Sequence, residues 1–121
     1  AAGLATLRAL ETPGTYERLE TLGARVERDV VEAARAAGVP VTVNRVGSML
    51  TVFFTDGPVT DYQSARRADT ARYARYFHAM REHGVFLAPS QFEAAFVSLA
   101  HREEDLALAA RACRAALEKA R

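Results

Sequence analysis

Two runs of β-branched and aromatic residues, 39–45 and 49–55, flank a break at Gly47 and constrain the fold more than any other feature. Runs of this composition favour strands, and a short glycine-containing break between them favours an antiparallel hairpin. The Asp-Gly-Pro sequence at 56–58 is typical of the turn that ends a strand. The sequence therefore predicts a small antiparallel sheet, and its apolar face needs helices to cover it.

Helical periodicity accounts for most of the remaining chain. Apolar residues spaced three and four apart predict a long helix over residues 16–37, and Gly38 suits its C-terminal end. Thr15 is expected to cap the start of this helix through its hydroxyl. The same reasoning predicts helices at 1–11, 64–83 and 103–119, and short strands at 85–88 and 95–100.

The predicted order of elements is α-α-β-β-α-β-β-α. This order suits an α+β fold, in which helices pack on one face of a small antiparallel sheet of three to four strands. At 121 residues the chain has the length of one domain, so residues 1–121 are expected to form a single unit. The helix over 64–83 is expected to turn one stripe inward: Ala65, Ala68, Ala71, Ala74, Phe77 and Met80.

Charge and composition argue against several kinds of partner. The formal net charge is +1 and the basic residues are mixed with acidic ones, so nucleic acid is not an expected partner. No apolar run is long enough to cross a bilayer, and no signal peptide is expected. The single cysteine, Cys113, cannot form an internal disulfide and suits a reducing compartment. His78 and His83 are five residues apart, whereas a helical zinc pair needs three or four, so no metal site is expected.

The run 84–98 carries one carboxylate, Glu93, among alternating apolar residues. In a regular strand, Glu93 would share a face with Ala95, Val97 and Leu99. An ionised carboxylate on such a face needs a cation, hydrogen bonds or water. The alternative is that the strand begins at Ala95 and that Glu93 is a solvated turn residue.

Three stretches carry a resemblance to a known family. They are residues 88–105 around Glu93, residues 44–56 from Asn44 to Asp56, and the opening residues 1–7. Together they resemble the glutamate-1-semialdehyde 2,1-aminomutases, which are pyridoxal-phosphate-dependent, class III aminotransferase-like enzymes of tetrapyrrole (porphyrin) synthesis. The resemblance covers essentially the whole chain, but only the last quarter to third of a typical family member.

The resemblance implies the C-terminal small domain of a fold type I pyridoxal phosphate enzyme, with residues 1–14 as the end of a linking helix. The intact enzyme would be a cytoplasmic homodimer that converts glutamate-1-semialdehyde to 5-aminolevulinate, with the cofactor held by a larger domain outside this chain. The only lysine, Lys119, lies near the end of the last predicted helix, where a positive charge is favourable. The cofactor lysine is therefore expected elsewhere, and this chain alone is expected to bind no cofactor and to be inactive.

The resemblance also implies roles for individual residues. Related aminotransferases carry an arginine at the position of Glu93, whereas an aminomutase-like chain has this glutamate, which would orient a substrate ammonium. Gln91 and Ser90 are weaker substrate-binding candidates that would shape the turn around it. His101 is expected to cap the last helix. Arg102, at the cap position just before Glu103, has a side chain that cannot accept an N–H. The alternative is a stand-alone α+β module that binds a ligand or partner without catalysis.

Overall fold

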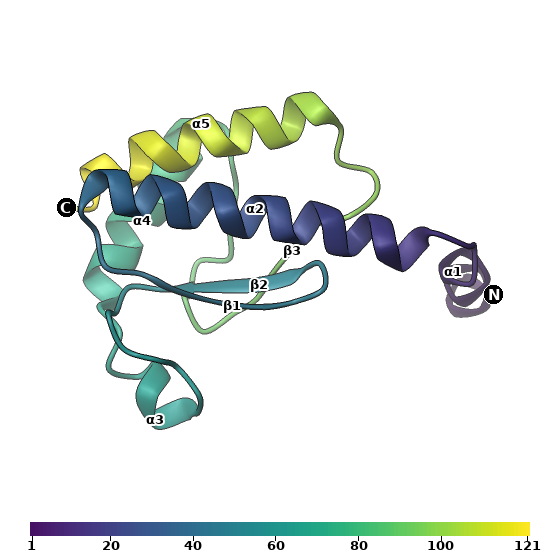
Figure 1. The fold of residues 1–121 in the computed structure, drawn as a ribbon, viewed down its shortest axis with the longest axis horizontal. Helices are drawn as coiled ribbons and strands as arrows, with labels where there is room; N and C mark the ends of the chain where they lie inside the picture. The colour runs from purple at the N-terminus through teal and green to yellow at the C-terminus, as the bar shows by residue number, and fades with distance from the viewer.

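The computed structural model describes all 121 residues as five helices and one three-stranded antiparallel sheet (Figure 1). The predicted α+β class with a small antiparallel sheet is confirmed. None of the five helices combines the length and the apolar character that crossing a membrane requires. In chain order the elements are α1 (Ala2–Leu10), α2 (Thr15–Ala37), β1 (Thr42–Val46), β2 (Met49–Phe53), α3 (Tyr62–Ala65), α4 (Thr70–Glu82), β3 (Ala95–Phe96) and α5 (Glu103–Lys119).

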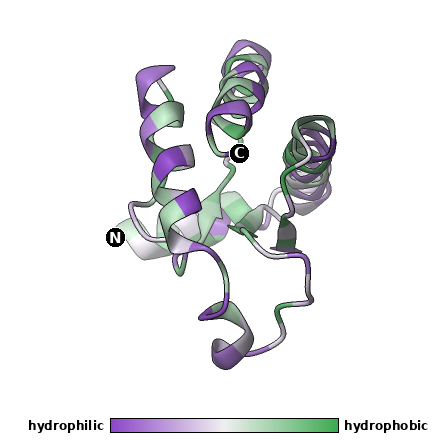
Figure 2. Ribbon diagram, turned by 90° about the vertical axis from the view of Figure 1, so that its left-hand side faces the viewer, coloured by the Kyte–Doolittle hydropathy of each residue, from purple (hydrophilic) through white to green (hydrophobic).

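The helices α2, α4 and α5 form a layer on one face of the sheet, as Figures 1 and 2 show together. In Figure 2 the hydrophilic residues of these helices lie mainly on their outer sides. The main core lies between this layer and the sheet, and Leu117 of α5 is completely buried in it. Phe54 joins the same core directly after β2. Burial of these apolar side chains is the main term that stabilises the arrangement.

Strands β1 and β2 form the predicted hairpin around Gly47, whose φ of 57° lies in the left-handed region that favours glycine. Arg45 and Leu50 are partners across the two strands and both face the helix layer. The guanidinium of Arg45 binds Glu20 at 2.8 Å and Glu27 at 2.6 Å, both on α2. The hydrogen bond from Arg45 holds the pKa of Glu20 below its usual range.

The opposite face of the sheet is open at the hairpin end. Val46 pairs with Met49, and Met49 pairs with Phe96 of β3, so their side chains lie side by side on this face. Val46 is 74% exposed, Met49 39% and Phe96 68%. We call these three residues the open sheet face. At the other end of the same face, Phe53 is covered by a small cluster that contains Val59.

Helix α2 begins one residue earlier than predicted, and the prediction that Thr15 caps it is wrong. Gly14 occupies the cap position with a φ of 83°, and no side chain caps the helix. Thr15 is instead the first helical residue and is buried. The C-terminal prediction is confirmed, because Gly38 ends the helix in the left-handed conformation.

The predicted helix over 64–83 is two helices, α3 and α4. The carboxylate of Asp61 accepts the Ser64 N–H at 2.7 Å and caps α3, while Asp69 accepts the Arg72 N–H at 2.9 Å and caps α4. Two such caps within nine residues start two separate helices. The predicted inward stripe is also wrong in part: Ala71 and Ala74 are exposed, and the buried positions of α4 are Tyr73, Tyr76, Phe77, Ala79 and Met80.

Residues 85–88 form no strand, and the strand predicted over 95–100 is only Ala95–Phe96. Pro89 has no N–H to give to a ladder, and the N–H of Val85 instead bonds to Met80 O at 3.0 Å, at the end of α4. Beyond β3, one more bond joins Val97 N to Ser48 O at 2.9 Å before the chain turns toward α5. The segment that carries Glu93 is therefore a loop between a helix and a two-residue strand.

The first and last helices match their predicted ranges closely. Helix α1 buries none of its residues, and its Leu4 and Leu7 are more than half exposed. Helix α5 spans the predicted residues, and Arg102 at its N-cap makes no side-chain cap, as expected. The carboxylate of Asp105 accepts the Arg102 N–H at 2.8 Å, so the acidic first turn supplies part of the missing cap.

Candidate functional site

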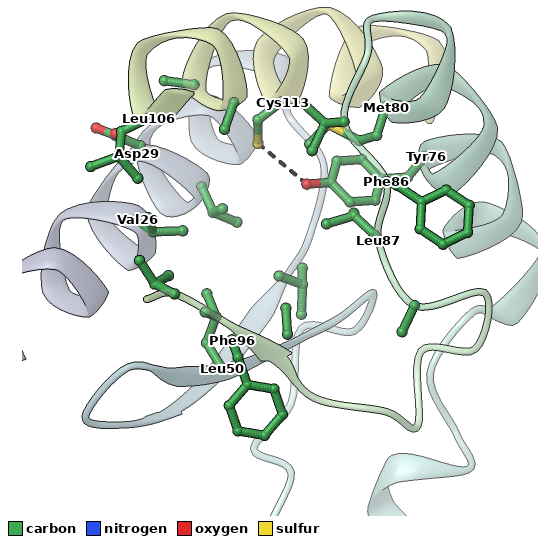
Figure 3. A pocket seen from close by; sticks show the side chains of 18 of the residues that line it. Val26, Asp29, Leu50, Tyr76, Met80, Phe86, Leu87, Phe96, Leu106 and Cys113 are labelled. Atoms are coloured by element: carbon green, nitrogen blue, oxygen red, sulfur yellow. Dashed lines mark hydrogen bonds between the residues drawn. The ribbon is translucent and has the colours of Figure 1, made fainter. Parts of the chain in front are cut away.

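A cavity of about 590 Å³ lies between the helix layer and the sheet (Figure 3). Its walls are mostly apolar and come from α2, α4, α5, β2, the loop segment 84–88, and β3 with the residues on either side of it, 93–97. In Figure 3 the ring of Phe96 lies on the far side of the sheet from the helices, and Phe86 lies at the outer edge of the cavity. A cavity with this lining favours apolar groups, so its polar contacts are few and specific.

Two polar groups meet on the helix side of this cavity. The hydroxyl of Tyr76 donates to Cys113 Sγ at 3.5 Å, and both residues are buried (Figure 3). Burial raises the pKa of the Tyr76 hydroxyl well above its usual range and also raises the pKa of the Cys113 thiol. Both groups are therefore uncharged near neutral pH. A neutral buried thiol is a poor nucleophile, so this pair is a core contact.

Glu93 is an exposed residue of the cavity lining, in a bend that Ala94 separates from β3. The alternative that the strand begins at Ala95 is confirmed, and the side chain of Glu93 is exposed. Its backbone is held on both sides, because Glu93 N–H donates to Ser90 O at 3.2 Å and Thr51 Oγ1 donates to Glu93 O at 3.4 Å. Its carboxylate has no hydrogen-bond or ion-pair partner within the chain. The carboxylate is thus free to receive a cation from outside.

The two weaker candidates shape the turn before Glu93. Ser90 Oγ accepts the Phe92 N–H at 3.2 Å, which is a local turn contact. Gln91 is only 2% exposed, its Nε2 lies 3.5 Å from Ala68 O, and its Oε1 has no partner. Gln91 therefore anchors the loop to the α3–α4 connection and does not reach solvent.

Tyr73 is a residue of this region that the sequence reasoning missed. Its hydroxyl donates to Ala88 O at 2.5 Å, just before the turn that leads to Glu93. Burial, with a smaller contribution from the charge of Glu93, raises the pKa of Tyr73 to about 12. The sequence signal for it is the helical spacing of Tyr73, Tyr76 and Met80 on α4, which matches the buried face better than the predicted alanine stripe does.

Lys119 lies away from this cavity. Its Nζ binds Glu82 Oε2 at 2.6 Å, and both side chains are more than half exposed. The position in the last turn of α5 is the one predicted, and the ion pair joins α5 to the end of α4. An exposed, ion-paired lysine does not fit the role of a desolvated Schiff-base lysine, and no cofactor-binding residue is assigned within this chain.

The histidines take other roles. His101 Nδ1 accepts the Ser98 N–H at 3.0 Å, so the prediction that His101 caps α5 is wrong and its ring closes the preceding turn. The cap position is occupied by Arg102, one residue later. His78 packs its ring against Phe77 at 5.3 Å between centroids. No three His, Cys, Asp or Glu side chains are grouped in a way that could hold a metal ion.

Comparison with known proteins relates this chain to one enzyme family. No family model matches it. The chain is 63% identical over 107 residues to the glutamate-1-semialdehyde 2,1-aminomutase of Myxococcus xanthus, covering 88% of this chain and 25% of that protein. It is 56% identical over 118 residues to the Thermus thermophilus enzyme of the same name, covering 97% of this chain and 28% of that protein. The chain thus spans about a quarter of the length of these relatives.

Solved structures agree on the fold. An omega-transaminase from Sphaerobacter thermophilus matches with a TM-score of 0.81 and 29% identity, over 98% of this chain and 27% of that one. A glutamate-1-semialdehyde aminomutase from Pseudomonas aeruginosa in complex with PMP matches with a TM-score of 0.79 and 24% identity, over 96% of this chain and 26% of that one. Over the quarter of its relatives that it spans, the chain belongs to the glutamate-1-semialdehyde 2,1-aminomutase family.

Proposed function

We propose that the chain is the C-terminal part of an enzyme that converts glutamate-1-semialdehyde to 5-aminolevulinate in porphyrin synthesis. The observation that carries this proposal is the 63% identity over 107 residues to a glutamate-1-semialdehyde 2,1-aminomutase. Reactant and product are isomers: an amino group and a carbonyl oxygen exchange places between two adjacent carbons, so no net oxidation occurs. The enzyme is then an isomerase that transfers an amino group within one skeleton.

Pyridoxal phosphate is the proposed cofactor of the whole enzyme, and the part of the protein outside this chain would hold it. The PMP complex of a structurally similar aminomutase supports this assignment. The cofactor would supply the reversible binding of the amino group. Because Lys119 is exposed and ion-paired, we assign this chain no part in holding the cofactor and expect it to be inactive alone.

The proposed role of Glu93 is to orient an ammonium group of the substrate or of its diamino intermediate. Its carboxylate is unpartnered within the chain, and Glu93 is an exposed residue of the lining of an apolar cavity. A carboxylate there attracts a positively charged amine and repels a second carboxylate, which helps determine which amine reacts. Ser90 and Gln91 would act through the shape of the turn, with at most a weaker direct contact to substrate.

The remaining partners follow from the same proposal. The open sheet face exposes Val46, Met49 and Phe96 side by side, and this apolar surface suits contact with the larger, cofactor-binding domain. Residues 1–14 would be the end of a helix that links the two domains, which agrees with the absence of buried residues in α1. We further propose that the intact enzyme is a cytoplasmic homodimer.

The test is Glu93→Gln in the full-length enzyme, compared with Glu32→Gln. Glu32 is exposed on α2 and has no ion-pair partner, so its replacement changes the charge equally but away from the cavity. A hydrogen bond to a charged group is worth about 1.5–3 kcal/mol, so Glu93→Gln should lower kcat/KM by roughly 10- to 150-fold. Glu32→Gln should leave the rate within about twofold.

Two results would contradict the proposal. Equal kinetics for the two variants would remove Glu93 from the site. Failure of the unchanged full-length protein to convert glutamate-1-semialdehyde would favour the alternative of a stand-alone ligand- or partner-binding module. In that case the apolar cavity, about 590 Å³ in volume, would be the place to look for the ligand.

A further inference from the structure

We propose that Tyr73 positions Glu93 by fixing, through its hydrogen bond to Ala88 O, the loop segment that carries the carboxylate. This inference rests on the proposed role of Glu93 and adds a residue to it. Tyr73 itself reaches no substrate in this scheme. It acts on the reaction only through the backbone of the segment from Ala88 to Glu93.

The loop from 86 to 93 has few hydrogen bonds to the rest of the molecule. Its other attachments are apolar: Leu87 packs on the main core, Phe86 on Phe77, and Phe92 on Tyr62. It belongs to no strand or helix, so no ladder of backbone hydrogen bonds holds it. Three hydrogen bonds reach it from outside, and two of them are long: Gln91 Nε2 to Ala68 O at 3.5 Å and Thr51 Oγ1 to Glu93 O at 3.4 Å. The bond from Tyr73 to Ala88 O, at 2.5 Å, is the short one. It is therefore the strongest polar anchor of the loop.

The restraint at Ala88 passes along the chain to Glu93. The hydrogen bond fixes the plane of the peptide between Ala88 and Pro89, and the proline ring fixes the next φ near −65°. Proline also restricts Ala88 to extended conformations. The next turn is closed by the Phe92 N–H to Ser90 Oγ bond at 3.2 Å and the Glu93 N–H to Ser90 O bond at 3.2 Å. The backbone of the segment is therefore restrained at both ends, at Ala88 by Tyr73 and at 90–93 by the turn.

The anchor itself is rigid. Tyr73 is 7% exposed, and its ring packs against Phe54 at 6.2 Å and against Tyr76 at 6.3 Å between centroids. It lies in the first turn of α4, which Asp69 caps. Because the pKa of Tyr73 is raised to about 12, its hydroxyl keeps its proton and remains a donor near neutral pH. The donor is thus held in place by a packed core.

The test is Tyr73→Phe in the full-length enzyme, with Tyr76→Phe as the matched control. Both residues are buried tyrosines of α4 that pack on Phe54, and both variants lose one hydroxyl. The Tyr76 hydroxyl, however, contacts Cys113 and not the loop. Hydrogen–deuterium exchange of the amides at 90–93 reports whether the loop loosens, independently of activity. Steady-state kinetics in the wild-type and Glu93→Gln backgrounds report whether the effect passes through Glu93.

We expect Tyr73→Phe to speed exchange at 90–93 and to lower kcat/KM by about three- to tenfold, the value of one ordinary hydrogen bond. Tyr76→Phe should change neither by more than about twofold. In the Glu93→Gln background the kinetic effect of Tyr73→Phe should largely disappear. Unchanged loop exchange, or kinetic effects that add fully to those of Glu93→Gln, would overturn the inference while the proposed function stands. An inert Glu93→Gln would instead overturn the proposed function and, with it, this role of Tyr73.

Discussion

Replacing Gly23 with alanine should destabilise this fold, although alanine is the better helix former. Gly23 is buried on α2 where the helix meets the turn of the β1–β2 hairpin. An added Cβ would lie far inside van der Waals contact with Gly47 O and only 3.2 Å from the Cα of Ser48. Both of these are backbone atoms, which cannot rotate away as a flexible side chain would.

The neighbouring ion pairs prevent the hairpin from moving aside. Arg45 bonds to Glu20 and Glu27, which lie one turn before and one turn after Gly23 on α2. The same guanidinium donates to Gly47 O at 2.8 Å, so the oxygen that the new methyl group meets is held in place. Relief of the clash therefore requires the loss of several favourable contacts at once.

The two opposing terms can be compared. Gly to Ala in a helix interior gains about 1 kcal/mol of helix propensity. Overpacking of a well-packed site costs typically 1–3 kcal/mol, and a clash with fixed backbone belongs at the upper end, about 3 kcal/mol. The net expectation is a loss of about 2 kcal/mol, equivalent to a fall in Tm of roughly 6–12 °C for a chain of this size.

Urea and thermal denaturation of the chain, followed by circular dichroism, measure this loss. Gly3→Ala is the control, because a Cβ at Gly3 of α1 meets nothing within 4 Å. That variant should be unchanged or slightly more stable. The reasoning is refuted if Gly23→Ala proves as stable as the wild type, because the clash would then cost no more than the gain in helix propensity.

Three further outcomes are expected. Leu117→Ala, at a completely buried position, should cost about 2–5 kcal/mol in urea denaturation, whereas Leu108→Ala, at a residue 38% exposed, should cost under about 1 kcal/mol. Arg45 lowers the pKa of Glu20 in the folded state, so this ion pair stabilises the fold above the unfolded-state pKa and loses its effect as the pH falls through the folded-state pKa. Arg45→Gln should therefore flatten the fall in Tm below about pH 5. An unaltered slope of Tm against pH would contradict this expectation. Cys113 should react with Ellman's reagent only on unfolding, because burial raises its thiol pKa; rapid reaction of the folded chain would show that the site is open.

Local sequence signals predicted most of the elements, because each signal acts within a few residues. The range of α5, the hairpin around Gly47 and the end of α2 at Gly38 all follow from side-chain periodicity and glycine conformation. The division of 64–83 into α3 and α4 was missed, although the carboxylates that cause it, Asp61 and Asp69, are visible in the sequence. Local cues thus failed where two overlapping signals, periodicity and capping, competed.

The sequence by itself determined the fold class, the family resemblance and the choice of Glu93 as the residue to test. Only the tertiary structure decided that β3 is two residues long, that Glu93 lies in a bend of the cavity lining, and that Tyr73 holds Ala88. The physical reason is the distance along the chain: Tyr73 and Ala88 are 15 residues apart, and Thr51 and Glu93 are 42 apart. Contacts of that range depend on how whole elements pack, and no local period of side chains specifies them.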